Sequence, residues 1–552
     1  MGLIYSVDMH IVENKVKHKN KIYNSILLRE SYREGGKVKK RTIANLSHCS
    51  REEIEAIKLA LKCKGNLAQL IDMGKDIKLE QGLCVGAVWA LYRCAERLGI
   101  VKALGSTVEG RLALWQVLAR VIMQGSRLGS VRLAKQHAVL EVLGFRRGFD
   151  ENDLYDNLKW VAKNQEKIES RLLKARGKKG EIKLFLYDVT SSYLEGDKNY
   201  FGEYGYNRDG KKGKKQIVIG LLCDDEGVPV SVEVFKGNTN DMETFGAQVK
   251  KTAERFGCSE VTFVGDRGMI KRKQIEKLPE GFHYITAITK AEIRTLLKKR
   301  IIELGFFDED LCEVIDGSIR YILRRNPLRQ RELNRWREEK IRRIKEKIAE
   351  RNKYLSEHPR AKVEVALRRI TAEIEKLKME KWALVEAMGR ELYLRIDKET
   401  FDKEQMLDGC YVIKTDLTRD IADKNTIHQR YKDLSLVEQA FRTSKSTLEV
   451  RPVFVRTKES TRGHIFIVML AYILVRYLKQ AWEGLDITVS EGITYLSQIS
   501  SIKVTVNKKG KCLKIPSPTG KAKSLLKAIS VSLPKVLPSR KYNVVTRKKL
   551  AK

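Results

Sequence analysis

LFLYDVT, residues 184–190, is the stretch that decides the fold, because its apolar run predicts a buried strand that Asp188 ends. VTFVGD, residues 261–266, repeats this pattern and ends in Asp266. Open α/β sheets place their sites at the carboxyl ends of strands, where a carboxylate is costly to desolvate unless a cation meets it. The pair therefore indicates a Mg²⁺ site, although either aspartate taken alone is equally typical of a residue that caps the following turn.

Further strands and helices surround these two stretches. Apolar runs at 216–223, 228–235 and 283–289 predict three more strands, separated by turns. Helical patterns at 241–257 and 271–278 lie between the later strands. The resulting order of strand, strand, strand, helix, strand, helix, strand predicts an α/β fold.

A third carboxylate, Glu438, lies in the stretch HQRYKDLSLVEQAFRTSKSTLEV at 428–450. If this stretch is one helix, then at about 100° per residue Tyr431, Arg442 and Lys445 fall within roughly 40° of Glu438 on the same face. Such a face is expected around a metal-binding Glu that lies close to phosphates. An ordinary amphipathic helix with a charged solvent face has the same pattern, so this helix alone does not decide between the two.

The charge of the chain indicates a polyanionic partner. Its 552 residues include 108 Lys and Arg against 70 Asp and Glu, a net charge of +38. Nucleic acid is the first candidate, ahead of an anionic membrane surface and a ribosomal role. The most apolar run, 465–475, is too short to span a bilayer and predicts a buried helix, so we expect no membrane association. Nine scattered Cys without a C-x-x-C pair favour reduced thiols over a zinc site.

The length predicts several domains, and changes in the residue pattern along the chain indicate where their boundaries lie. Two β-rich arms around Gly35-Gly36 predict a hairpin, and charged helices around Pro359 predict an antiparallel helical pair. We expect the end of the chain to be loosely ordered. The expected parts are an N-terminal β-hairpin region at 1–50, a helical DNA-binding domain at 51–180, an α/β core at 181–290, an insertion domain at 291–410, the second part of the core at 411–490, and a basic C-terminal tail at 491–552.

Several of these motifs together carry a family resemblance. The blocks DVTSSYLEG, YGYNRDGKKGKKQIVIGLL, FVGDRGM and YKDLSLVEQAFRTSK occur in an order that resembles insertion-sequence DDE transposases of the Y-R-E-K branch. The resemblance runs from about 181 to 480, apart from 291–410. It implies an RNase H-like mixed sheet flanked by helices and interrupted by an insertion domain before the catalytic Glu. The opening hairpin and LYDNLKW also resemble the leading region of one subgroup of that family.

The resemblance implies roles for individual residues. Asp188 matches the first catalytic Asp within D-x-T, Asp266 matches the second within D-R-G-M, and Glu438 matches the catalytic Glu. These three carboxylates are the expected ligands of two Mg²⁺ ions, for which Mn²⁺ can substitute. Apart from the resemblance, the basic cluster that includes Lys214 and Lys215 precedes a strand next to the site, and we expect these lysines to contact DNA phosphates, although a solvated turn has the same pattern.

The Y-R-E-K signature itself is matched at three of its four positions. Tyr431, Glu438 and Lys445 fit the spacing, whereas Leu434 stands at the Arg position. Leu434 belongs to an apolar stripe of the helix, so we expect it to be buried against the core. Arg442, one turn beyond Glu438, is the best-placed substitute for the missing guanidinium because Arg holds a phosphate with two parallel hydrogen bonds.

These features predict a DNA transposase that cleaves insertion-sequence ends and joins the 3′-OH to target DNA by two-metal-ion phosphoryl transfer. The expected partners are double-stranded DNA, as terminal inverted repeats and target, and a second copy of the chain in a synaptic homodimer. We expect a cytoplasmic, nucleoid-associated bacterial protein. The alternatives are another RNase H-like nuclease such as a junction resolvase, a catalytically inactive nucleic-acid-binding descendant, and a structural or ribosome-associated basic protein.

Overall fold

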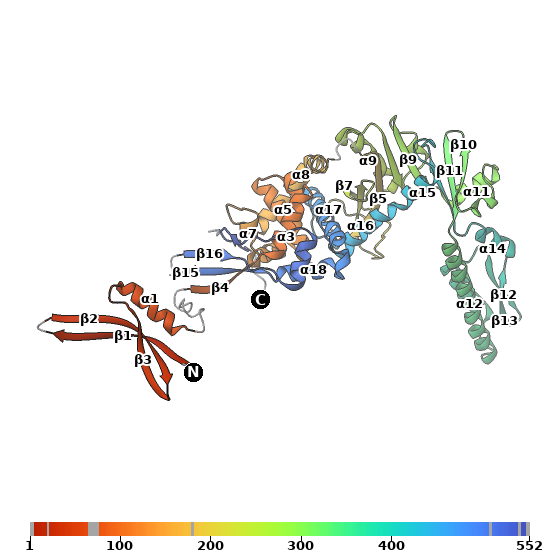
Figure 1. Ribbon diagram of the computed structural model, residues 1–552. Coiled ribbons are helices and arrows are strands. Elements are labelled where there is room, and N and C mark those ends of the chain that lie inside the picture. Colours follow the sequence, from red (N-terminus) through yellow and green to blue (C-terminus); the bar gives the residue numbers. More distant parts are fainter. Residues whose placement is uncertain are drawn as a thin grey trace.

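The computed structural model describes six stretches of the chain, namely residues 5–18, 21–64, 77–177, 182–506, 510–538 and 542–547. Along the chain it contains a small N-terminal sheet, a helical domain, a large mixed sheet and an insertion that carries a helical hairpin (Figure 1). The sheet and the helical domain share one hydrophobic core.

The N-terminal sheet has three antiparallel strands in sequence order, β1 (Tyr5–His18), β2 (Lys21–Glu34) and β3 (Lys37–Asn45). Gly35 and Gly36, at the β2–β3 turn, both have positive φ, 57° and 77°. A two-residue turn of this kind needs positive φ at both positions, which glycine adopts without steric cost. The predicted hairpin is confirmed, and β1 adds a third strand to it.

Helix α1 (Arg51–Lys62) packs against this sheet, not against the helical domain. Ser50 and Glu53 form the capping box that begins the helix, and Lys58 Nζ lies 2.8 Å from Glu13 Oε1 on β1. The predicted boundary at residue 50 therefore divides one structural unit, because a capped helix start does not show which surface the helix will cover.

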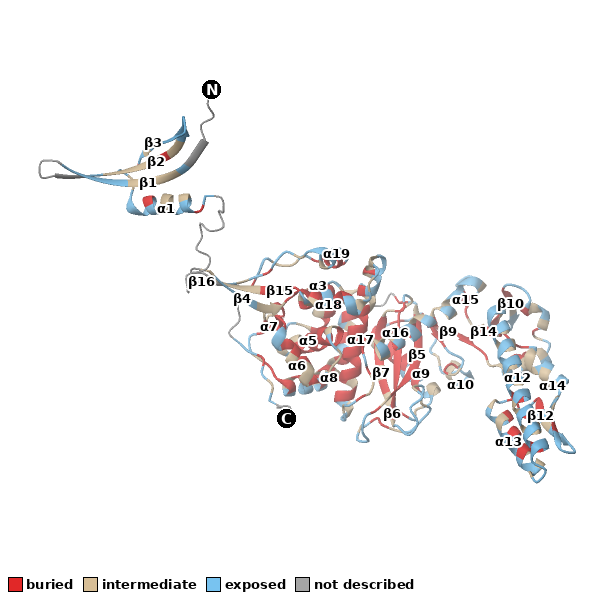
Figure 2. Cartoon of the chain, turned by 90° about the horizontal axis from the view of Figure 1, so that it is seen from below, coloured by how far each residue is buried: buried red, intermediate tan, exposed pale blue. Residues whose placement is uncertain are grey.

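The helical domain is built around α17 (Lys458–Ala481), which lies between α5 and α8 on one side and strand β7 on the other (Figure 2). The other helices of this domain are α3 (Gly86–Arg97), α4 (Ile100–Leu104), α5 (Val108–Ile122), α6 (Arg127–Gln136), α7 (Val139–Val142) and α8 (Glu151–Ala175). Among the described residues, α17 is the one helix that is long and apolar enough to cross a membrane, but 83% of its apolar window is buried inside the protein. Its apolar character is therefore explained by its central place in the core, as predicted.

The C-terminal region is folded, which corrects the expectation of a loosely ordered tail. It contributes α18 (Val489–Ser497) and α19 (Gly520–Ala528), together with β15 (Ser500–Val506), β16 (Gly510–Lys514) and β17 (Val536–Leu537). These strands form a sheet with β4 (Ile77–Cys84), which lies in the region predicted to be entirely helical. Ser500 and Cys84 pair although they are 416 residues apart, a contact that no local sequence pattern reveals.

The large sheet has eight strands in the order β10-β11-β14-β9-β8-β5-β6-β7. Strands β5, β6 and β7 form an antiparallel meander, and β8 and β9 run parallel to β5, which is consistent with an RNase H-like core. The strands are β5 (Leu184–Tyr193), β6 (Gln216–Cys223), β7 (Pro229–Lys236), β8 (Val261–Gly265), β9 (Phe282–Ala287), β10 (Cys312–Asp316), β11 (Ile319–Arg325) and β14 (Cys410–Thr415), and the helices around them include α9 (Asp241–Lys251), α10 (Arg272–Ile275), α15 (Lys424–Lys432) and α16 (Leu434–Ser446).

Strand periodicity decides which helices each side chain faces. Phe185, Tyr187 and Phe263 belong to the hydrophobic cluster that includes α9. Leu186 and Val264 belong to the cluster that includes α16 and α17. Because side chains alternate between the two faces of a strand, the residues two positions after Leu186 and Val264 lie on the α16 side of the sheet. These residues are the two predicted catalytic aspartates.

The insertion both extends the sheet and adds a separate core. Strand β11 pairs with β14, and β10 pairs with β11 at the edge of the large sheet, so the insertion continues this sheet where we predicted an interruption. Beyond them, α12 (Pro327–Glu357) and α13 (Val363–Lys376) form the predicted antiparallel helical pair. The insertion also contains α11 (Lys290–Lys298), β12 (Ala383–Met388), β13 (Glu391–Ile396) and α14 (Lys398–Gln405).

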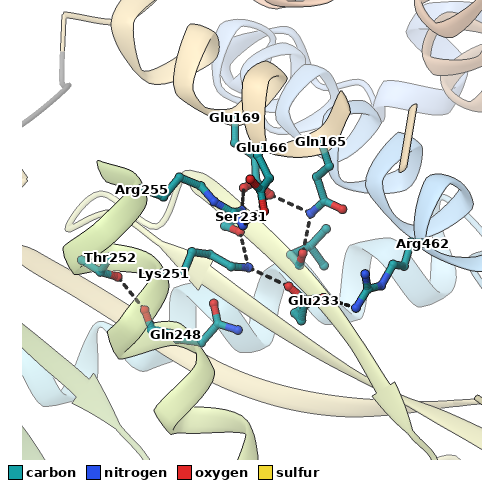
Figure 3. Close-up of polar contacts among 11 residues, drawn as sticks. Gln165, Glu166, Glu169, Ser231, Glu233, Gln248, Lys251, Thr252, Arg255 and Arg462 are labelled. Atoms are coloured by element: carbon teal, nitrogen blue, oxygen red, sulfur yellow. Dashed lines mark hydrogen bonds and ion pairs between the residues drawn. The ribbon is translucent and has the colours of Figure 1, made fainter. Parts of the chain in front are cut away.

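A polar network joins the helical domain to the edge strand β7 (Figure 3). Glu169 on α8 is fully buried and accepts hydrogen bonds from Arg255 Nη1 at 2.6 Å and Ser231 Oγ at 2.8 Å. Lys251 Nζ donates to Ser231 Oγ and to Glu233 Oε2, both at 2.9 Å. We call this set the β7 network; its members are Gln165, Glu169, Ser231, Glu233, Lys251, Arg255 and Arg462.

Candidate active site

The first two predicted ligands lie side by side on neighbouring parallel strands. Tyr187 on β5 pairs with Gly265 on β8, and the next residues are Asp188 and Asp266. Adjacent strands lie about 4.8 Å apart, so these carboxyl groups start from backbones at contact distance and point to the same face. One correction is needed, because β5 continues to Tyr193 and Asp188 therefore lies within the strand instead of ending it. Asp266 follows the end of β8, as predicted.

The electrostatics of Asp188 link it to both of the other predicted ligands. Burial raises the pKa of Asp188 to about 7, and the charges of Asp266 and Glu438 add to this rise. The backbone amide of Val189, which donates to Asp188 Oδ1 at 2.7 Å, and the charge of Arg208 oppose it. Asp188, Asp266 and Glu438, which we call the carboxylate cluster, therefore share one electrostatic environment.

Glu438 is placed by the way that α16 packs. Leu434, Val437 and Phe441 are buried, and α16 contacts β5 and β6 through this apolar stripe. Glu438 follows Val437 on the helix and is exposed. The prediction that Leu434 is buried against the core is confirmed, since only 9% of its surface is accessible. Leu434 at the signature's Arg position is therefore part of the packing that holds α16 on the sheet.

Tyr431 lies on a different helix from Glu438. The structure has two helices here, α15 ending at Lys432 and α16 starting at Leu434, with a turn at Asp433 between them. The assumption of one continuous helix was therefore wrong. Tyr431 nevertheless faces the site: its Oη donates to Asp266 Oδ1 at 3.5 Å. Burial and the charge of Asp266 raise its pKa, so it stays a neutral hydrogen-bond donor.

The carboxylate cluster suits a hard divalent cation, although it is not a closed ligand set. No group of three or more His, Cys, Asp or Glu in the described parts of the chain is arranged to hold a metal ion as it stands. Carboxylate oxygens are the ligands that Mg²⁺ and Mn²⁺ prefer. Arg208 is the cation that bears on Asp188, and its guanidinium already binds Asp241, at 2.9 and 2.7 Å from the two carboxylate oxygens.

The remaining residues of the predicted phosphate-binding face differ in whether an internal ion pair already holds them. Arg442 is exposed, lies four residues beyond Glu438 on α16, and forms no ion pair within the described residues. Lys445 Nζ, by contrast, lies 2.8 Å from Oδ1 of the buried Asp209. Lys445 is thus engaged in an internal ion pair, whereas Arg442 is free to meet a ligand.

The two predicted lysine contacts lie further from the carboxylate cluster. Lys214 Nζ is 3.0 Å from Glu195 Oε1, and Lys215 Nζ lies over the ring of Tyr204 at 5.7 Å. Both belong to the segment between β5 and β6, which begins roughly 17 Å along β5 from Asp188 at about 3.3 Å per residue. The structure therefore places them along a path that leads away from the cluster.

Arg208 is a residue of the site that the sequence analysis missed. Its backbone amide donates to Ser191 Oγ at 3.0 Å, so the segment before β6 folds back onto β5, and the charge of Arg208 lowers the pKa of Asp188. Tyr206, with 83% of its surface accessible, lies against the Arg208 guanidinium at 5.9 Å. The available signal was the arginine between an aromatic residue and an acid in YGYNRDG, a tract that we had assessed only for its lysines.

Comparisons with known proteins agree with this geometry. Residues 179–474 match the family described as "Transposase DDE domain", and residues 11–69 match "IS1634 family transposase, N-terminal domain". No curated protein matches the chain. A solved structure, "Cryo-EM structure of piggyBac transposase synaptic complex with hairpin DNA (SNHP)", is 10% identical over 82% of each chain with a TM-score of 0.34, a weak likeness.

The first of these matches spans more than half of the chain and includes all three residues of the carboxylate cluster. DDE transposases use divalent metal ions, for which the cluster provides candidate ligands. The second match covers the N-terminal sheet and α1, which the structure also joins into one unit. The chain therefore belongs to the DDE transposases, enzymes that act on DNA in transposition, and its first part matches the N-terminal domain of IS1634 family transposases.

Proposed function

We propose that this transposase cleaves DNA at the ends of its insertion sequence and joins the freed 3′-OH to target DNA at a two-Mg²⁺ site formed by Asp188, Asp266 and Glu438. Mn²⁺ can substitute for Mg²⁺ at such a site. The proposal is supported by the side-by-side placement of Asp188 and Asp266 on parallel strands and by the raised pKa of Asp188, to which the charges of Asp266 and Glu438 contribute. Such a concentration of negative charge favours a divalent cation.

Backbone hydrogen bonds fix the two aspartates in a way that suits ligand binding. The amide of Val189 donates to Asp188 Oδ1 at 2.7 Å, and the amide of Arg267 donates to Asp266 Oδ1 at 2.8 Å. In each carboxylate one oxygen is thereby oriented, and Oδ2 remains to coordinate an ion. Held by these residues, such ions would supply the Lewis acidity needed to activate an attacking water or 3′-hydroxyl and to stabilise the leaving oxygen of the scissile phosphate.

Glu438 completes the set when substrate binds. Its side chain is exposed on α16, and within the described residues no hydrogen bond holds it in place. Since the cluster is not closed as it stands, we infer that Glu438 turns toward Asp188 and Asp266 once metal and DNA are present. A flexible third carboxylate can follow the changing charge of the phosphate between the cleavage and joining steps.

The basic residues around the cluster are proposed to hold the DNA. Tyr431 contacts Asp266, and Arg442 lies one turn beyond Glu438 on α16, so these two are the first candidates for phosphates that flank the scissile bond. Lys445, Lys214 and Lys215 would exchange their present partners for phosphates further along the strand. We propose terminal inverted repeats and target DNA as the partners, a homodimer in the synaptic complex, and the bacterial nucleoid in the cytoplasm as the place of action.

A cleavage assay with end DNA tests this function directly. The purified protein is incubated with a duplex of the element's own end and flank plus Mg²⁺, and the products are mapped at nucleotide resolution. We expect cleavage at the element end with a 3′-OH, followed by joined products when target DNA is added. Cleavage by an Asp188→Asn variant, or cleavage by the wild type in EDTA, would contradict the proposal.

A further inference from the structure

A pocket of about 450 Å³ lies between the helical domain and the segment that follows α16. Three features distinguish its wall: buried arginines, a helix N-terminus, and a single carboxylate among all the residues that line it. The wall residues that matter here are Arg120 on α5, Ser126 and Arg127 at the start of α6, Glu449 and Arg451 after α16, and His464 on α17.

The two arginines are buried, and neither is bound to a carboxylate in the part of the chain that the structure describes. Arg127 is 6% exposed; its Nη2 donates to Nδ1 of His464 at 3.1 Å, and its Nε has no hydrogen-bond partner among the described residues. Arg120 is 7% exposed and forms no ion pair within the described residues. Burial and the charge of Arg120 lower the pKa of Arg127 to about 9. A buried guanidinium that lacks an anion is costly, so an anion that enters the pocket is strongly favoured.

The neighbouring groups in the pocket add to this preference. His464 remains neutral, because burial and the charges of Arg127 and Arg120 lower its pKa well below the usual value. Helix α6 is ten residues long, and the pocket is lined by its N-cap Ser126 and its first residue, Arg127. The backbone amides of a helix start carry partial positive charge and bind phosphate oxygens. Guanidinium groups beside such amides form a site of the kind that recognises phosphate.

The pocket is connected to the catalytic strand. Arg451 in its wall forms an ion pair with Asp209, which also binds Lys445 of α16. The amide of Val453 donates to the carbonyl of Tyr193, the last residue of β5, at 3.1 Å. The pocket therefore lies beyond the end of β5, whose catalytic aspartate is roughly 17 Å further back at about 3.3 Å per residue.

We propose that this pocket binds one backbone phosphate of the element-end DNA, which Arg120, Arg127 and the first turn of α6 hold against the segment after α16. This inference rests on the proposed function and adds a second anchor away from the carboxylate cluster. DNA is favoured over a free anion because the enzyme acts on DNA and carries a net charge of +38. A phosphate held here fixes the register of the DNA strand that passes the catalytic site.

Binding measurements with matched variants test the pocket without relying on cleavage. Affinity for a labelled duplex of the element's own end is measured by anisotropy in EDTA over a range of salt concentrations. Arg127→Gln and Arg120→Gln are each expected to weaken binding about tenfold and to make the slope of log K against log salt shallower by about 0.9, the value for one phosphate. Arg132→Gln, on the same helix but outside the pocket, is the control and should do neither.

Thermal melting separates this role from a structural one. Because removal of an unpaired buried charge relieves a desolvation cost, Arg127→Gln should melt at the same temperature as the wild type or higher. A lower melting temperature together with wild-type affinity and salt slope would overturn the proposal. If one variant does not fold, the other still reports on the pocket.

DNA in which single phosphates are replaced by neutral methylphosphonates identifies which phosphate contacts the pocket. One position should weaken binding by the wild type and have no further effect on Arg127→Gln, and the lack of any such position would overturn the proposal. Stabilisation of the wild type but not of Arg127→Gln by inorganic phosphate, with DNA binding equal in both, would assign the pocket to a free anion instead. Loss of cleavage in Asp188→Asn tests the proposed function separately, since the binding assay contains no metal.

Discussion

The carboxylate cluster and the β7 network lie on the same sheet, but they differ in whether their carboxylates are paired with cationic side chains. In the β7 network each acid has its cation: Glu169 binds Arg255, and Glu233 lies 2.9 Å from Lys251. Although burial opposes it, the charge of Lys251 leaves the pKa of Glu233 below its usual value. In the carboxylate cluster, burial and two neighbouring acids raise the pKa of Asp188 to about 7.

This difference separates a structural acid from a functional one. A buried carboxylate that serves the fold is accompanied by a lysine or arginine from a neighbouring element, as Glu169 and Glu233 are. A carboxylate whose main neighbours are other carboxylates costs stability unless a cation from outside completes it. Substitutions in the two clusters should therefore have opposite effects on activity and stability, and the following predictions compare them from the largest effect to the smallest.

The largest effect is expected at the carboxylate cluster. Asp188→Asn, Asp266→Asn and Glu438→Gln should each reduce cleavage by roughly 10³-fold or more, because each removes a ligand of ions that contribute several kcal/mol to the transition state. End-DNA affinity should change less than about twofold, since it depends on the many Lys and Arg. Cleavage rates and anisotropy are measured on the same preparations, and a Glu438→Gln variant with wild-type cleavage would remove Glu438 from the site.

The same variants should leave the fold intact, in contrast to the β7 network. Asp188→Asn removes a half-buried carboxylate that forms no ion pair among the described residues, so the free energy of unfolding should stay the same or rise. Chemical denaturation checks this expectation. A loss of several kcal/mol in Asp188→Asn would show that this carboxylate serves the fold in the way that Glu169 does.

Arg255→Met in the β7 network should reduce stability by about 3–5 kcal/mol, because it leaves the fully buried Glu169 without its cation. The double variant with Glu169→Gln should recover most of that loss. Lys250→Met, which breaks an exposed pair with Glu254 on the adjoining turn, is the matched control and should cost about 0–1 kcal/mol. Equal losses of stability in Arg255→Met and Lys250→Met would contradict the view that the buried Glu169 depends on its cationic partner.

A smaller effect is expected at Arg442. Because this exposed arginine has no ion pair in the described part of the chain, Arg442→Ala should not affect melting. It should reduce cleavage of end DNA about tenfold, the usual contribution of a charge-assisted phosphate contact. Lys432→Ala, an exposed cation on α15, serves as the control. Wild-type cleavage by Arg442→Ala would show that Arg442 does not substitute for the signature arginine, whose position is occupied by Leu434.

The smallest effect is expected at Lys214. This residue is exposed and paired with Glu195, so Lys214→Ala should weaken DNA binding only about two- to threefold. The slope of log K against log salt should become shallower by at most about 0.9, the contribution of one phosphate. The wild-type slope should itself be steep, and a nearly salt-independent affinity would contradict a DNA-binding role for the net charge of +38.

Much of the core was predictable because its signals are local. Apolar strands, the hairpin glycines at Gly35 and Gly36, and the helical pair around Pro359 each follow from a short stretch of sequence. The burial of Leu434 followed from an apolar stripe in the same way. Family resemblance then indicated which acids to connect, and that step required motifs spread over about 250 residues.

The features that escaped prediction depend on contacts between distant segments. No local pattern indicates that β4 pairs with β15, or that β10 and β11 extend the large sheet. The turn at Asp433 interrupts a helix whose amphipathic pattern continues on both sides of it. We predicted that Lys445 contacts DNA. Its ion-pair partner Asp209 lies more than 200 residues earlier in the chain, so the sequence around Lys445 does not reveal this pair. Similarly, Arg120 and Arg127 became a candidate site only when their burial without an acid was visible.

The central claim is that Asp188, Asp266 and Glu438 together hold the divalent metal that cleaves DNA. The most direct test is the anomalous scattering of Mn²⁺ in crystals of the enzyme bound to its end DNA. We predict Mn²⁺ peaks between the three carboxylates at coordination distances of about 2.0–2.3 Å, with the scissile phosphate beside them. Mn²⁺ bound at other residues, or Glu438 still directed to solvent in that complex, would contradict the account.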